Sequence, residues 1–474
     1  YKNSTYFDEI YHARTAYEHI LGLEPYENTH PTLGKLIISL GIRLFGMNPF
    51  GWRFMGALFG VLMLPVLYHL LKQLFGRTRL AFAGTVLFAF DFMHFTQTRI
   101  ATIDTYAVFF LLLMYDAMVV FLKGDVGRDS WKRLLPPLLV CGVFTGLGIA
   151  AKWTAAYGAL GLAGLFFGKL AFTLWEARRR GEEVRPLVRK CLQLCAWCCL
   201  FFIVIPFAIY FAAFLPITTL SHNGGKLWWA FWNYQTTMFN YHAHLEATHS
   251  FASPWYEWPF DIRPIWYFAQ DNWNGYSTIS SFGNPLLWWG CLPALAAAAY
   301  LWWKERPRWA AVVLAGFGSV YLPWVLVPRL TFIYHYFTAV PFLVVALCGV
   351  FSLLYEKGPF ARRLTFPGGL ECQGTTLLLA AFAAGCLLLF AVYFPVLSGA
   401  PTTREYADCL IAGISVEKEP RESKYKVFGP LVCRLGRLLG NVPLGRNSPF
   451  SKGLRGVGQG PTVLSLLGGS QEKS

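Results

Sequence analysis

Long apolar runs separated by short polar segments make up most of the chain. A helix needs about 20 mostly apolar residues to cross a bilayer, and about ten such runs recur. They lie at residues 51–75, 80–96, 103–122, 135–151, 154–175, 191–215, 285–303, 309–327, 334–355 and 375–397. Backbone groups in lipid must satisfy one another, and the runs are too long and unbroken for barrel strands. The pattern therefore predicts an all-α integral membrane bundle.

A different pattern precedes the first run. Between residues 32 and 45 apolar side chains recur at helical spacing, while Lys35 and Arg43 interrupt them. This spacing predicts an amphipathic helix that lies on the outer membrane surface. Pro31 suits its first turn, and a residue among 28–30 is expected to cap it.

The pattern divides the chain into a first outer loop (1–50), spanning helices (51–215), a large aromatic loop (216–284), further spanning helices (285–398) and a tail (399–474). Loops as long as 216–284 without periodic structure are commonly functional. The tail is basic and Gly-rich, and it receives no role. The chain opens on Tyr1 and a polar stretch, so we expect a signal-anchor helix upstream of it.

Composition excludes a soluble globule, because the 474 residues are 55% hydrophobic and only 14% charged, against about 25% in soluble domains. The net charge of +15 comes mostly from alternate loops, which hold Arg77, Lys123, Arg178, Lys304, Arg362 and their basic neighbours. The positive-inside rule places those loops in the cytoplasm, and segments 1–49 and 216–284 outside. The charge therefore reflects topology and does not indicate a nucleic-acid partner.

Cysteine and histidine do not indicate a metal site. The spacing of Cys195 and Cys198 falls inside an apolar run and lacks a second pair, so we interpret these residues as small apolar side chains. His242, His244 and His249 lie in the aromatic loop, but their spacing is not specific for a metal. Neither a metal nor an organic cofactor is predicted.

Cations are unusual in outer loops, yet Arg99, Lys152 and Arg329 lie there, with Lys35 and Arg53 at comparable depth. Cations gathered at one membrane face favour an anion, and a lipid phosphate is the natural candidate. The alternative is that each cation snorkels or pairs locally.

The dipeptide Asp8-Glu9 precedes the amphipathic helix. Consecutive helical side chains point about 100° apart, so the two carboxylates are expected to take different roles. One could accept a proton from a hydroxyl, and the other could orient a cation or the acceptor; the alternative is a solvated helix start. Asp104 could cap the helix that begins near Ile103 or pair with Arg99. In the large loop, Trp255 and Trp258 could stack on a sugar or peptide, or form part of an interfacial belt.

Taken in order, several motifs resemble the protein O-mannosyltransferase family, and most closely its short bacterial members. The motifs, which lie within residues 6–408, are Phe7-Asp8-Glu9, His30-Pro31-Thr32-Leu33-Gly34-Lys35, Trp52-Arg53-Phe54, Thr98-Arg99-Ile100-Ala101-Thr102-Ile103-Asp104, Lys152-Trp153-Thr154, Ser253-Pro254-Trp255-Tyr256-Glu257-Trp258-Pro259, Arg263-Pro264-Ile265-Trp266-Tyr267 and Gly283-Asn284-Pro285.

The resemblance implies a C-class glycosyltransferase fold that moves mannose from a polyprenyl phosphate lipid to Ser or Thr hydroxyls of a protein, with inversion, outside the cytoplasm. Asp8 would be the catalytic base and Glu9 its partner in the acceptor site, while Arg53 matches the essential arginine of the family. The donor phosphate is expected to contact Lys35, Arg53, Arg99 and Lys152, with His30, Asp104 and Arg263 in support.

Three departures qualify the resemblance. Thr32 stands where the family usually repeats proline, and the tail after Asp408 does not look like the family. The sugar-loop insertion of the eukaryotic enzymes is missing, which indicates a bacterial plasma-membrane enzyme with a bacterial polyprenyl donor. Two alternatives stay open: a transferase of the same fold that acts on a lipid or cell-wall polymer, and a transporter or channel.

Overall fold

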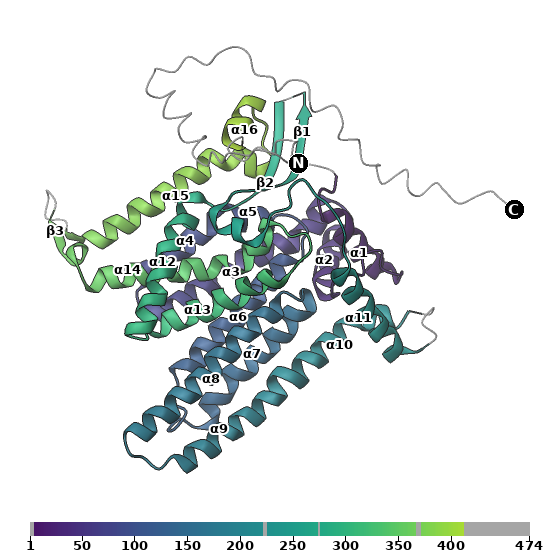
Figure 1. Cartoon of the computed structure of the whole chain (residues 1–474). Helices are drawn as coiled ribbons and strands as arrows, with labels where there is room; N and C mark the ends of the chain where they lie inside the picture. Colours follow the sequence, from purple (N-terminus) through teal and green to yellow (C-terminus); the bar gives the residue numbers. More distant parts are fainter. Residues whose placement is uncertain (1–3, 221–224, 274, 366–370, 412–474) are drawn as a thin grey trace.

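The structure is a computed structural model that describes residues 4–220, 225–273, 275–365 and 371–411. Within these residues, eight stretches are helical, long and apolar enough to cross a membrane. They are α3 (Pro49–Phe75), α6 (Asp104–Lys123), α7 (Trp131–Ala151), α8 (Ala155–Arg179), α9 to α10 (Val184–Thr218), α12 (Pro285–Lys304), α13 with η4 (Arg308–Leu326) and α15 (Gly374–Ser398). Two shorter apolar helices are α4 (Thr78–Ala89) and α14 (Val340–Glu356). The expected helical bundle is confirmed (Figure 1).

Local signals explain where the first spanning helix begins and ends. The side chain of Asn48 accepts hydrogen bonds from the backbone of Phe50 and Gly51, which caps α3. Pro49 follows at the first helical position, where its missing N–H costs nothing. Gly76 ends the helix with φ 70°, a left-handed conformation that favours glycine.

The amphipathic helix is α2 (Leu33–Phe45), which packs against α1 (Glu9–Leu21) and α3 beside the spanning helices (Figure 1). Ile38 is fully buried, whereas Leu44 on the other face is 68% exposed. The cap was predicted wrongly, because Thr32 itself is the N-cap residue. Residues 28–30 are instead held upstream of α2, where the carboxylate of Glu27 accepts the backbone N–H of Thr29 (2.8 Å).

The apolar run at 80–96 is broken, contrary to expectation, into α4 and α5 (Phe92–Thr98). Asp91 causes the break. Its Oδ1 accepts the backbone N–H groups of Met93 (3.1 Å) and His94 (3.2 Å). Its Oδ2 accepts the indole N–H of Trp288 (2.9 Å) from α12. A fully buried carboxylate thus caps one helix and ties it to another.

The large loop contains structure that periodicity did not predict. It holds α11 (Leu227–Ala243), η3 (Trp255–Phe260) and an antiparallel hairpin of β1 (Ile265–Asn272) and β2 (Gly275–Ser281). Tyr276 in this hairpin forms an isolated bridge with Thr402, which follows α15. The expected all-α chain therefore carries a small sheet, and a second one pairs β3 (Arg363–Thr365) with β4 (Glu371–Gln373).

Part of the expected tail belongs to the folded molecule. Residues 404–411 form α16 (Arg404–Ile411), and Ala407 and Leu410 are buried. Residues 412–474 of the tail lie outside the described residues.

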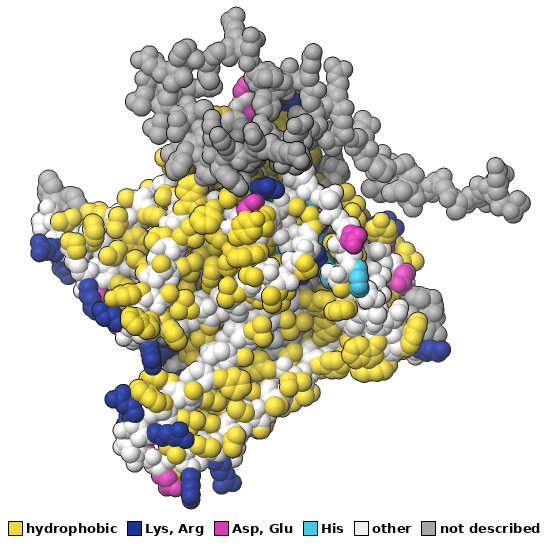
Figure 2. Space-filling model, in the orientation of Figure 1, with side chains coloured by type: hydrophobic (Ala, Val, Ile, Leu, Met, Phe, Trp, Pro, Cys, Tyr) yellow, Lys and Arg dark blue, Asp and Glu magenta, His cyan; other side chains and the backbone are white. Residues whose placement is uncertain are grey.

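Basic side chains are concentrated on one face of the bundle. Lys and Arg gather along the lower left edge in Figure 2, near the α8–α9 and α14–α15 connections in Figure 1. Arg77, between α3 and α4, pairs with Glu356 at the end of α14 (3.3 Å), which places the α3–α4 and α14–α15 connections on the same face. Acidic and histidine side chains appear on the other side, beyond a wide hydrophobic surface (Figure 2). We call the first of these the basic face.

We expect Asp91→Ala to lower the free energy of unfolding by roughly 2–4 kcal/mol, because two backbone caps and a buried indole N–H lose their acceptor. The thermal midpoint in detergent measures the effect. Asp125→Ala is the control, since Asp125 accepts the backbone N–H groups of Gly127 and Arg128 in an exposed turn. An equal loss in both variants would contradict a special role for the buried carboxylate.

Candidate active site

The two carboxylates of the first outer segment diverge at the start of α1. Asp8 is the N-cap residue and Glu9 is the first helical residue. Glu9 is fully buried. Its Oε1 accepts from Arg53 Nε (2.7 Å) and the backbone N–H of Ala101 (3.0 Å). Its Oε2 accepts from Arg53 Nη2 (2.8 Å) and the backbone N–H of Tyr6 (3.3 Å).

Four donors therefore surround the carboxylate of Glu9. This arrangement leaves it the role of orienting a cation, one of the two roles expected for the second carboxylate. A direct place in the acceptor site does not fit, because Glu9 is enclosed by protein.

The guanidinium of Arg53 is fully engaged by its contact with Glu9 and its neighbours. Its guanidinium forms a two-pronged contact with Glu9, donates to the backbone oxygen of Ser4 (3.1 Å) and lies 4.6 Å from the ring centroid of Tyr6. Its side chain is only 16% exposed. Such forked pairs are strong and geometrically specific. Arg53 therefore fixes the first outer segment against α3, and a direct contact with the donor phosphate is not supported.

The surroundings of Asp8 differ from those of Glu9. Its side chain is partly exposed, and its carboxylate accepts no hydrogen bond from any residue that the structure describes. Burial raises the pKa of Asp8 to about 7, while the positive charge of Lys152 opposes this and the negative charges of Asp104 and Glu27 add to it. A carboxylate that is unpartnered, reachable and weakly acidic suits general-base chemistry near neutral pH.

Lys152 and Asp104 form a buried ion pair beside Asp8. The ammonium of Lys152, just after α7, donates to Oδ1 of Asp104 (2.7 Å), the first residue of α6. It also lies 5.5 Å from the ring centroid of Tyr334. Both expected structural roles of Asp104 are thus wrong: Ile103 is the N-cap of α6, and the partner of Asp104 is Lys152 and not Arg99.

Arg99 lies between α5 and α6 without an acidic partner. Among the described residues, no carboxylate is within ion-pair distance of it, and its Nη1 makes only a long contact with the backbone oxygen of Leu397 (3.4 Å). Its pKa is lowered by burial and by the nearby charge of Arg53, although Glu9 and Tyr6 act in the other direction. Arg99 is therefore a cation whose charge is only partly balanced.

Lys35 has a partner that the sequence analysis missed. Its fully buried ammonium donates to the carboxylate of Glu27, to the backbone oxygen of Glu27 (3.1 Å) and to that of His30 (2.9 Å). Burial opposes ionisation of Glu27, but Lys35 and His30 hold the pKa of this carboxyl well below its usual range. Since an ammonium has three donors, Lys35 has none left for a phosphate. The expected phosphate contact is not supported for this residue.

Glu27 also positions histidines. His30 Nδ1 lies 3.1 Å from Glu27 Oε1, and His242 Nε2 lies 2.8 Å from the backbone oxygen of Thr29. His30 therefore supports the segment before α2, in keeping with its expected supporting role.

No three His, Cys, Asp or Glu side chains in the described part of the chain are arranged to hold a metal. His242 and His249 point to different partners, since the ring of His249 packs on Phe332.

The aromatic loop corrects two further expectations. Trp258 is fully buried, and its indole N–H donates to Oγ (3.0 Å) and the backbone oxygen (3.2 Å) of Ser253. Trp258 is thus a core residue and cannot touch a sugar. Trp255 packs against Tyr321 but stays partly exposed. Arg263 pairs with Glu257 (3.3 Å) and braces the loop.

Arg329 was noted in the sequence but not placed in the site. It is partly exposed, and among the described residues it forms no ion pair. Its charge nevertheless reaches the same surroundings as Asp8, because both residues shift the pKa of Tyr241, which burial mainly raises. Arg329 and Lys152 also both lower the pKa of His242, which burial and His30 bring to about 4. Asp8, Lys152 and Arg329 therefore border one region on the face opposite the basic face.

Comparison with known proteins agrees with this arrangement. Residues 1–220 match the family described as dolichyl-phosphate-mannose-protein mannosyltransferase. Residues 227–411 match the C-terminal four-helix membrane region of protein O-mannosyltransferases. The chain belongs to this family.

Relatives named polyprenol-phosphate-mannose–protein mannosyltransferase match this chain over most of its length. The Mycobacterium tuberculosis protein is 28% identical over 458 residues, which is 84% of both chains. The Corynebacterium glutamicum protein is 25% identical over 382 residues, or 69% of this chain and 71% of the relative. Membership of the family makes this chain a membrane glycosyltransferase.

Solved structures show the fold. The protein O-mannosyltransferase Pmt1-Pmt2 complex of S. cerevisiae, bound to its sugar donor, superposes with a TM-score of 0.71 at 14% identity, covering 86% of this chain and 88% of that one. ArnT from Cupriavidus metallidurans, bound to undecaprenyl phosphate, gives a TM-score of 0.54 at 15% identity, over 92% and 69% of the two chains. The expected C-class glycosyltransferase fold is confirmed.

The Glu9–Arg53 pair generates a prediction on stability and activity. Arg53→Ala should lower the free energy of unfolding by roughly 3–5 kcal/mol, because it leaves a buried carboxylate without its cation. Adding Glu9→Gln removes that orphaned charge, so the double variant should regain part of the stability without regaining transfer activity. Thermal unfolding in detergent of the two single variants and the double variant measures the coupling. Strictly additive losses would show that the two residues do not act as a unit.

Proposed function

We propose that this chain transfers mannose from a polyprenyl phosphate lipid to Ser or Thr hydroxyls of proteins, on the extracytoplasmic face of a bacterial plasma membrane. Membership of the family and the names of the mycobacterial relatives support this activity. The positive-inside rule supports the orientation, because the proposed site lies opposite the basic face. One observation carries the assignment: Asp8 is an unpartnered carboxylate in a region that also holds the cations Lys152 and Arg329.

The chemistry follows from these groups. The acceptor oxygen attacks the anomeric carbon of mannose, the bond from that carbon to the phosphate oxygen breaks, and polyprenyl phosphate departs as an anion. The hydroxyl proton passes to the carboxylate of Asp8. Attack opposite the leaving group inverts the anomeric carbon. Because the leaving group is already an anion, fixed cations in a partly dry site supply the electrostatic stabilisation, and the chemistry calls for neither an organic cofactor nor a metal.

The donor phosphate is assigned to Arg329, Arg99 and Lys152. Arg329 and Arg99 have charges that no described carboxylate balances, so both are suited to an incoming anion. Lys152 is held by Asp104, yet its charge still reaches Asp8. Lys35 and Arg53 are left out of this set because their donors serve Glu27 and Glu9.

Asp8→Asn tests the base. The change removes a proton acceptor at nearly constant volume, so turnover should fall by about 10²–10⁴, while the dissociation constant of the donor stays within about threefold. In the unaltered enzyme, kcat/KM should rise with pH through about 7, because the base acts only when deprotonated and its pKa is raised to about 7. Above that pH the profile should level off. A flat profile between pH 5 and 9, or near-normal turnover of Asp8→Asn, would assign the base elsewhere.

Arg329→Gln tests the phosphate site. Loss of a charge-assisted contact should raise the KM for the lipid donor about tenfold or more. The KM for the peptide should change little. Arg404→Gln is the control, because Arg404, the first residue of α16, is an arginine whose charge is paired with Asp271 of the hairpin. Arg99→Gln in the same assay tells which arginine dominates, and an unchanged donor KM in both variants would remove the phosphate from this region.

An assay with labelled lipid donor and a Ser/Thr-rich peptide tests the function as a whole. Purified enzyme should label the peptide, and Asp8→Asn should not. Label found only in a glycolipid or polymer would support the alternative transferase of the same fold.

A further inference from the structure

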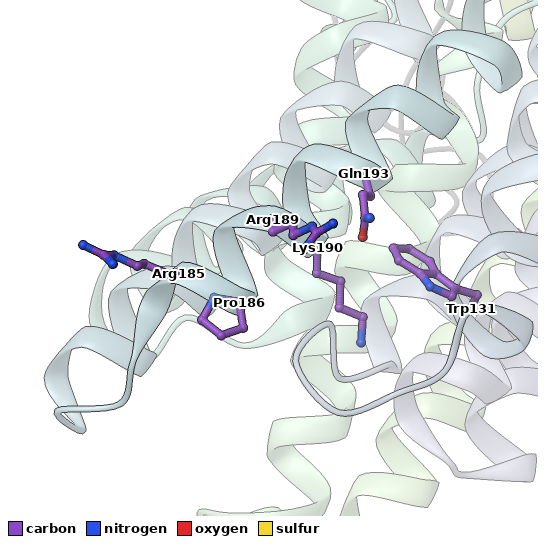
Figure 3. Close-up of a pocket in the computed structure, with 6 residues that line it drawn as sticks. All are labelled: Trp131, Arg185, Pro186, Arg189, Lys190 and Gln193. Atoms are coloured by element: carbon purple, nitrogen blue, oxygen red, sulfur yellow. The ribbon is translucent and has the colours of Figure 1, made fainter.

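A cavity of about 500 Å³ lies on the basic face, at the start of α7 and of α9 (Val184–Cys199). It is lined by Trp131, Arg185, Pro186, Arg189, Lys190 and Gln193 (Figure 3). The transfer site lies on the opposite face, so this cavity needs a different explanation.

The lining is strongly cationic. Among the described residues, neither Arg185 nor Arg189 has an ion pair or a side-chain hydrogen bond, and both are exposed. Lys190 donates to the backbone oxygens of Asp129 (2.7 Å) and Gly127 (3.2 Å), and it lies 5.7 Å from the ring of Trp131. In Figure 3, Arg189, Lys190 and Gln193 lie toward Trp131, while Arg185, one turn earlier in the helix, extends in the opposite direction. The nearby Asp129 is already paired with Arg133 (3.1 Å).

The helix itself adds to the positive potential. α9 begins at Val184, and its N-cap residue Glu183 accepts no capping hydrogen bond from its own helix. The first N–H groups of α9 and the positive end of its dipole lie beside Arg185 in the first turn, and the exposed carboxylate of Glu183 offsets part of this positive potential. Arg185 in the first turn and Arg189 in the second are therefore two cations without a described carboxylate partner near the N-terminus of α9.

An apolar path leads from these cations into the membrane layer. From Arg189, steps of three or four residues reach Leu192, Ala196 and Leu200, so these lie on one helical stripe. The stripe continues into the π-helical segment η1 (Leu200–Val204), which contains Ile203. Leu192 is 65% exposed and Ile203 is 64% exposed. The stretch from α9 to α10 is apolar, and most of it is not buried in the protein. Trp131 is the first residue of the candidate span α7, and Trp side chains are enriched at such span ends.

We propose that this cavity binds the headgroup of an anionic phospholipid. Arg185 and Arg189 hold the phosphate at the N-terminus of α9, Gln193 and Trp131 contact the rest of the headgroup, and an acyl chain lies along the stripe of Leu192 and Ile203. The exposed stripe favours a lipid over a free phosphate, because only a lipid covers it. Basic pockets between spanning helices commonly bind such headgroups. The inference does not depend on the transfer chemistry.

Native mass spectrometry of the full chain in detergent, titrated with phosphatidylglycerol, tests the proposal. The variant Arg185→Gln/Arg189→Gln should bind this lipid about 30-fold more weakly, since each basic group near a headgroup contributes about fivefold in affinity. The control Arg178→Gln/Arg362→Gln removes the same charge from the same face without touching the cavity, and should change the affinity less than threefold. Phosphatidylcholine should bind the unaltered protein at least tenfold more weakly than phosphatidylglycerol.

Two further arms make the result decisive. The thermal midpoint without added lipid, and transfer activity in detergent, should be unchanged in Arg185→Gln/Arg189→Gln, which shows that the variant is folded. Equal lipid affinity in this variant and the unaltered protein would overturn the proposal, as would an equal loss in the control variant. Displacement of the lipid by millimolar inorganic phosphate would also overturn it, because the cavity would then be a free-phosphate site.

Discussion

Neutralisation of buried charge is the constraint on which the region around the candidate site depends. A charged group removed from water is tolerated only with a partner, and breaking such a pair is costly. Glu9 and Arg53 satisfy each other 44 positions apart in sequence, and Glu9 also holds the backbone of Ala101. One carboxylate thus fixes the first outer segment to α3 and to the turn before α6. Asp8, its neighbour in sequence, is left without a partner, so the dipeptide combines an anchor with a reactive group.

Close backbone approach brings the remaining charges together. A Cβ atom at Gly34 would lie 2.6 Å from Ile103 Cγ2 and 3.3 Å from the backbone oxygen of Ala151. These two residues directly precede Asp104 and Lys152, so only glycine lets α2 settle against the helix ends that carry this pair. A Cβ atom at Gly51 would lie 2.0 Å from the backbone oxygen of Gly46, which shows that the turn from α2 into α3 is equally tight. Packing of small residues therefore sets the electrostatics of the site.

Sequence predicts the features of this protein that are local in the chain. The length of the apolar runs predicts the spanning helices, and the helical spacing of apolar residues predicts α2, because both signals depend on residues that are close in sequence. The break at Asp91 escaped this reasoning, since the carboxylate is stabilised by Trp288, which lies 197 positions away. The partner of Lys152 was missed for the same reason, because Asp104 lies 48 positions away. Glu27 is only eight positions from Lys35, but it lies in the connection between α1 and α2, where helical spacing gives no signal. Trp258 resembled a sugar contact because composition does not distinguish a buried indole from an exposed one.

The remaining question is why Asp8, the proposed base, keeps its proton affinity next to a lysine. Burial alone would make Asp8 hard to ionise, and full pairing with a cation would make it easily ionised but a poor proton acceptor. Lys152 avoids both extremes because its ammonium is bound to Asp104 (2.7 Å) and acts on Asp8 only through its field. The pKa of Asp8 then stands at about 7, where a useful fraction is ionised and proton affinity is still high. Asp104 thereby influences the proposed base, because it binds the ammonium of Lys152 and its own negative charge also raises the pKa of Asp8.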